Sequence, residues 1–87
     1  MATRESIDSC LKNCNEVLQF AEQQYLDASK QEHYNDDEYI QSQQLLQIAA
    51  NELQQLAHSS NDQQREQLNR MKMQIEQRQH DMITLRH

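Results

Sequence analysis

YNDDEYIQSQQLLQIAANELQQLAH, residues 34–58, is the stretch of the sequence that decides the fold. It begins like a helix, because Asn35 is a good N-cap residue and Glu38, three positions on, can bond back to the Asn35 amide. Tyr34 and Tyr39 have the spacing of the apolar pair that flanks such a start. At about 100° per residue, the apolar side chains that follow cover an arc of roughly 140°. That arc is too broad for one coiled-coil seam, so we expect a central helix that contacts two others.

The composition favours an all-α chain. Among its 87 residues there is no glycine and no proline, so tight hairpin turns and glycine-rich phosphate loops lack their usual residues. A chain of this length buries only about 60–65% of its unfolded surface and is long enough for one domain. We therefore predict a single helical domain over residues 1–87.

Apolar residues also recur at helical spacing on both sides of the central segment. From Ile7 to Ala28 they alternate at intervals of four and three, which is typical of a helix with one buried face. The C-terminal apolar residues, beginning with Leu68 and Met71, are about one position out of phase with those of the central helix. A straight helix through both would turn the second face away from the first by roughly 120°.

The segment HSSND, residues 58–62, is therefore expected to contain a turn, and its serines and asparagine can cap a new helix. We predict helices over about 4–32, 36–58 and 61–86, packed as an antiparallel three-helix bundle that runs up, down and up. The alternative is a two-helix hairpin with a long second helix that dimerises.

The charge and the hydropathy restrict the partners. The net charge of −6 argues against nucleic acid, which is usually bound by a basic surface. The sequence has no apolar run near the ~20 residues needed to cross a bilayer, and MATRESID lacks the apolar core of a signal peptide. We expect a cytoplasmic protein that binds neither nucleic acid nor membrane, with free thiols.

Cys10 and Cys14 are the first candidates for chemistry. In an antiparallel pair that turns near residue 33, His58 comes opposite Cys10 and Asp62 lies at the same end, so these four residues form an acceptable zinc set. Against this, both cysteines lie on or beside the buried stripe, and no second closely spaced ligand pair supports a metal. A structural role is favoured and no cofactor is expected; a thiol- or zinc-dependent sensor is the alternative.

Catalytic motifs are not evident. The sequence contains no nucleophile elbow and no phosphate loop, and it suggests no pair of catalytic carboxylates in a cleft, so we do not expect an enzyme. Spare apolar residues suggest binding instead. We expect a non-catalytic interaction or accessory protein that presents helix faces to a protein partner or to itself. The candidate partner surface consists of apolar residues outside the main stripes: Phe20, Leu26, Ile40, Ile48 and Met73.

Three segments carry a resemblance to a known family. QEHYNDDEY at 31–39, SSNDQQREQLNRM at 59–71 and the opening MATRESID resemble the YtzC-like family, small uncharacterised proteins of Bacillus and related spore-forming bacteria. The resemblance covers the whole chain. It implies a cytosolic bacterial protein, and it transfers no functional residue because the family has no assigned activity.

Overall fold

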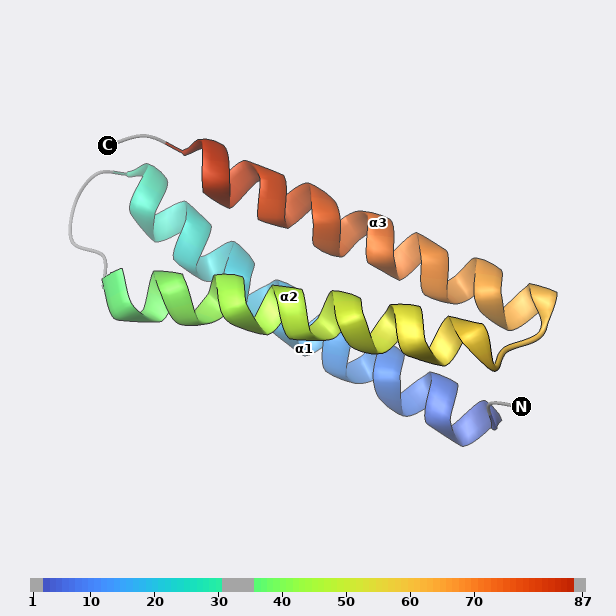
Figure 1. Cartoon of the computed structure of the whole chain (residues 1–87). Helices are drawn as coiled ribbons and strands as arrows, with labels where there is room; N and C mark the ends of the chain where they lie inside the picture. Colours follow the sequence, from blue (N-terminus) through green and yellow to red (C-terminus); the bar gives the residue numbers. More distant parts are fainter. Residues whose placement is uncertain (1–2, 31–35, 86–87) are drawn as a thin grey trace.

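The computed structural model describes residues 3–30 and 36–85, which form three helices: α1 (Arg4–Ser29), α2 (Asp36–His58) and α3 (Asp62–Thr84). The helices run up, down and up along a rod of 46 × 19 × 14 Å (Figure 1). Each helix packs against the other two. The predicted three-helix bundle is therefore confirmed, and the alternative with one long second helix is wrong.

Side chains fix most of the helix ends that the structure describes. The Thr3 hydroxyl accepts a hydrogen bond from the Ser6 amide at 3.0 Å and caps α1. That helix ends at Ser29 rather than at the predicted residue 32, and the Ser29 hydroxyl donates to the Leu26 carbonyl at 2.8 Å. The predicted cap at Asn35 and its Tyr34 flank lie outside the described residues.

The turn between α2 and α3 has two stabilising devices. The first is a capping box at the start of α3: the Gln64 amide donates to the Asn61 side chain at 2.8 Å, and the Asn61 amide donates to the Gln64 side chain at 3.1 Å. The helix thus begins at Asp62, one residue later than predicted. It ends at Thr84 instead of 86, because Leu85 adopts an extended backbone.

Arg65 is the second device. Its guanidinium donates to the Ala57 carbonyl at 3.2 Å and to the Ser60 carbonyl at 2.9 Å. The Ser60 hydroxyl donates to the Leu56 carbonyl at 2.6 Å. The Ser59 and Ser60 amides also donate to the Leu56 and Ala57 carbonyls, each at 3.2 Å. The last carbonyls of α2, which lack the amides of a further helical turn, are therefore satisfied by backbone and side-chain donors of the turn. The chain can reverse direction within a few residues, and α3 returns along α2.

The core lies along the centre of the bundle, with α2 supplying its middle. Hydrophobic side chains from all three helices meet there, and the interface between α1 and α3 is the smallest of the three. At one end the Tyr39 hydroxyl donates to the Met82 carbonyl at 2.6 Å, which joins α2 to α3. In the described ranges no helix is both long and apolar enough to span a membrane. The buried hydrophobic core consists of Ile7, Cys14, Val17, Ala21, Leu46, Ala49, Ala50, Leu53, Leu68, Ile75 and Met82.

Candidate functional site

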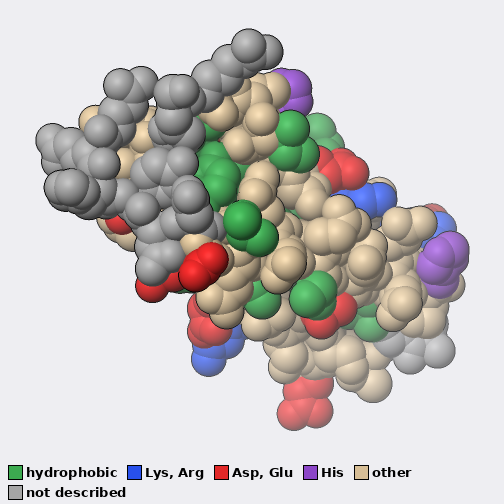
Figure 2. Space-filling model, turned by 60° about the vertical axis from the view of Figure 1, so that its left-hand side comes forward, with side chains coloured by type: hydrophobic (Ala, Val, Ile, Leu, Met, Phe, Trp, Pro, Cys, Tyr) green, Lys and Arg blue, Asp and Glu red, His purple; other side chains and the backbone are tan. Residues whose placement is uncertain are grey.

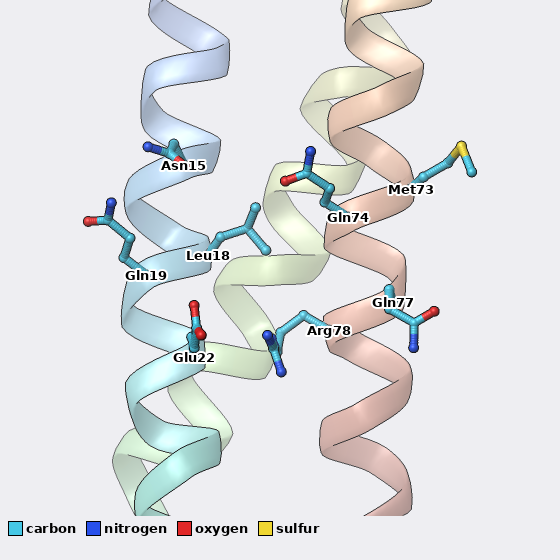
Figure 3. A pocket seen from close by; sticks show the side chains of 8 residues that line it. All are labelled: Asn15, Leu18, Gln19, Glu22, Met73, Gln74, Gln77 and Arg78. Atoms are coloured by element: carbon cyan, nitrogen blue, oxygen red, sulfur yellow. The ribbon is translucent and has the colours of Figure 1, made fainter.

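A groove of about 610 Å³ lies between α1 and α3 (Figure 3). These two parallel helices form the smallest of the three interfaces in the bundle. Leu18 points from α1 into the space between the helices, and Arg78 points toward it from α3, whereas Met73 is directed to the outer side of α3. The side chains that line the groove are Asn15, Leu18, Gln19, Glu22, Met73, Gln74, Gln77 and Arg78.

Arg78 is the best-anchored charge in this groove. Its guanidinium carbon lies 5.1 Å from the centre of the Tyr25 ring, and its Nη1 lies 3.3 Å from an Asp81 carboxylate oxygen. The cation therefore links α3 to α1 while its charge is partly balanced on its own helix. Four of the eight lining side chains are amides, and the only carboxylate among them is Glu22. The side chains of the groove can therefore form hydrogen bonds with a polar surface, but they include neither a pair of carboxylates nor a nucleophile.

The two cysteines lie one turn apart on α1. Cys14 is buried in the core, and Cys10 is half-buried at a second concavity of about 310 Å³ between α1 and α2. Burial raises the pKa of the Cys14 thiol from 9.0 to about 12, and the proximity of Cys10 and Glu52 acts in the same direction. Burial also raises the pKa of Cys10. Both thiols are therefore protonated at neutral pH and are weak nucleophiles.

The four residues of the predicted zinc set are not brought together. His58 lines a concavity that also includes Arg65 of α3, on the opposite side of α2 from the concavity that Cys10 lines. The Asp62 carboxylate is fully exposed and lies 3.8 Å from Arg65. Over residues 3–30 and 36–85, no three His, Cys, Asp or Glu side chains are grouped so that they could hold a metal ion.

Large apolar side chains reach solvent on all three helices. Figure 2 shows one face of the molecule, on which hydrophobic side chains form separate green areas among polar atoms. Phe20 is half-buried, whereas the other four residues of the predicted partner surface are exposed. Ile83 was not among the predicted partner residues, although its position directly after the buried Met82 is a sign that it points outward. The exposed fractions are 44% for Leu26, 51% for Ile40, 52% for Ile48, 69% for Met73 and 72% for Ile83.

Comparison with known proteins gives matches along nearly the whole chain. A family model described as "Protein of unknown function (DUF2524)" matches residues 1–84. The chain belongs to this family. A relative of this DUF2524 chain is the protein described as "Uncharacterized protein YtzC" from Bacillus subtilis (strain 168), and the two are 53% identical over 83 residues. The alignment covers 95% of the DUF2524 chain and 92% of the relative, which confirms the resemblance to the YtzC-like family. No solved structure matches.

The raised pKa of Cys14 predicts a pH dependence for this DUF2524 protein. Because the folded state holds the thiol proton more tightly than the unfolded state, the contribution of Cys14 to stability is complete below about pH 9 and is lost as the pH rises toward 12. We expect the free energy of unfolding, measured by urea titration at several pH values, to fall more steeply above pH 9 in the wild type than in Cys14→Ala. Parallel curves for the two proteins would contradict the pKa assignment.

Proposed function

We propose that this member of the DUF2524 family is a non-catalytic, cytoplasmic interaction protein that presents its helix faces to a protein partner or to a second copy. The observation that carries the proposal is the exposure of five large apolar side chains among the residues that the structure describes. Single exposed apolar residues are common on soluble proteins. A small domain that leaves five of them at 44–72% exposure keeps apolar surface available for burial against another molecule.

The concavities support a binding role more than a catalytic one. Half of the side chains that line the α1–α3 groove are amides, which form hydrogen bonds but do not act as nucleophiles or as acid–base groups at neutral pH. The thiols of Cys10 and Cys14 have raised pKa values, which disfavours a thiol-dependent sensor. Neither feature offers the activated group that a covalent or acid–base mechanism needs.

Affinity capture tests the proposal. The tagged full-length protein is incubated with a native cytosolic extract at physiological salt, and bound proteins are identified and quantified. We expect one protein to be retained in a fixed ratio, and its retention to fall at least several-fold when the exposed apolar side chain that it covers is replaced by serine. Gln44→Ser, an exposed polar change on α2, is the matched control and should retain the partner.

Self-association is measured in parallel. Size-exclusion chromatography with light scattering at tens of micromolar protein separates a monomer from a dimer. A strict monomer that also retains no protein in a fixed ratio would overturn the proposed function.

A further inference from the structure

One outer stripe of α3 has a regular pattern. Met73, Glu76, His80 and Ile83 follow one another at spacings of three, four and three residues, so they share one side of the helix, and all four are exposed. The two apolar residues at its ends are also the most exposed large hydrophobic side chains described in the protein. Between them the stripe carries a carboxylate and an imidazole. This is a surface with apolar contacts at both ends and an acidic group between them.

An exposed residue of α2 extends the stripe sideways. The Tyr39 hydroxyl donates to the Met82 carbonyl at 2.6 Å, so Ile40 and Ile83, which follow these two residues in the chain, lie at the same level of the bundle. Further along the same pair of helices, an amide hydrogen bond of 3.1 Å joins Gln79 to Gln47. Ile40 and Ile83 therefore flank the junction of α2 and α3. We call Ile40, Glu76 and Ile83 the α2–α3 surface.

The charge of the bundle is concentrated at the end where this surface begins. Residues 17–30, 36–47 and 74–85 form the half in which α1 ends, α2 begins and α3 ends, and they include seven acidic and two basic residues. The other described half, residues 3–16 and 48–73, includes six acidic and five basic residues. In Figure 2, which turns the first half toward the viewer, red acidic side chains lie close to green apolar ones.

We propose that the α2–α3 surface is the docking site for a basic amphipathic helix of a protein partner. The exposed isoleucines supply apolar contacts for one side of such a helix, and the excess of acidic residues in this half of the bundle favours lysine or arginine beside that apolar side. This inference rests on the proposed function and specifies the chemistry of the partner. A second copy is a poorer occupant, because a symmetric contact through this face brings the acidic halves of both copies together.

A designed peptide tests whether the α2–α3 surface binds a helix that is both basic and amphipathic. The probe is a fluorescent helix of about 18 residues, ~27 Å long, with leucines along one face and lysines along the other. Fluorescence anisotropy at 50 and 200 mM salt measures its affinity, and amide chemical-shift changes locate the contact. We expect binding that weakens at higher salt, with the largest shifts around Ile40 and Ile83. The double variant Ile40→Ser, Ile83→Ser should weaken binding by about tenfold or more.

The controls separate this surface from general attraction to an acidic protein. Ile48→Ser removes an equally exposed isoleucine of α2 that lies outside the α2–α3 surface, and it should leave the affinity within about twofold. A scrambled peptide of the same composition and a peptide with glutamates in place of the lysines should bind at least tenfold more weakly. Circular dichroism should show that single variants melt within about 4 °C of the wild type and the double variant within about 8 °C, since only exposed side chains change.

Three outcomes overturn the inference. Equal binding to the double variant and the wild type would show that charge alone holds the peptide. Shifts centred on the α1–α3 groove would place the contact elsewhere. Self-association that the double variant abolishes would make a second copy the occupant. If the peptide fails but affinity capture finds a partner that depends on Ile48, this inference falls while the proposed function stands.

Discussion

Replacing Leu46 with alanine should lower the free energy of unfolding by about 3 kcal/mol, more than any other substitution proposed for this protein. Leu46 is fully buried in the central helix, and its removal leaves a cavity in a core that touches all three helices. A domain of 87 residues has a total stability of about 4–13 kcal/mol, so this loss is a large share of it. Urea unfolding followed by far-UV circular dichroism measures the change.

Ile48→Ala is the matched control. It removes more of a side chain than many surface changes do, and Ile48 is only two residues from Leu46 on the same helix. Ile48 is 52% exposed, so we expect a change within about 0.5 kcal/mol. A similar loss of unfolding free energy in both variants would mean that the side of α2 that carries Leu46 does not face the core.

Arg65→Ala should destabilise the protein by about 1–2 kcal/mol, which is the second largest effect expected here. The change removes two hydrogen bonds to the carbonyls of Ala57 and Ser60 at the turn between α2 and α3. Arg65→Lys should recover only part of the loss, since an ammonium group does not have the planar arrangement of donors with which the guanidinium reaches two carbonyls.

Arg70→Ala is the control for Arg65. Arg70 also makes a short contact, 2.7 Å to Glu66, but both side chains are largely exposed and the pair lies on one helix. Such pairs contribute little, and we expect a change below about 0.5 kcal/mol. The interpretation of Arg65 as a clamp on the turn would fail if the two alanine variants unfolded at the same urea concentration.

Much of the fold could be predicted from the sequence because helical periodicity reports which side of each helix is buried. The stripe that includes Leu46 and Leu53 is in the core, and the change of phase before Leu68 marks a real turn. The bonds that hold that turn were not predictable in the same way. Arg65 reaches back eight residues to Ala57, and only the three-dimensional path of the chain brings the two together.

The candidate site was less accessible to sequence reasoning, since periodicity within one helix says little about its rotation against its neighbours. Pairing positions along an antiparallel hairpin put Cys10 opposite His58. In the structure Cys10 lines a concavity between α1 and α2, whereas His58 lines one between α2 and α3. The acidic half could not be predicted from the sequence for a related reason: its residues come from three segments that are far apart in the chain.

This uneven charge also gives the rod an electrical polarity along its length. At physiological ionic strength the Debye length is about 8 Å, several times shorter than the 46 Å length of the bundle. A charged molecule that approaches one tip is therefore screened from the other, and the two tips act as independent electrostatic environments. Diffusional encounters of cations with the acidic tip should be steered by its field and should slow as salt is added, whereas encounters with the nearly neutral tip should depend much less on ionic strength.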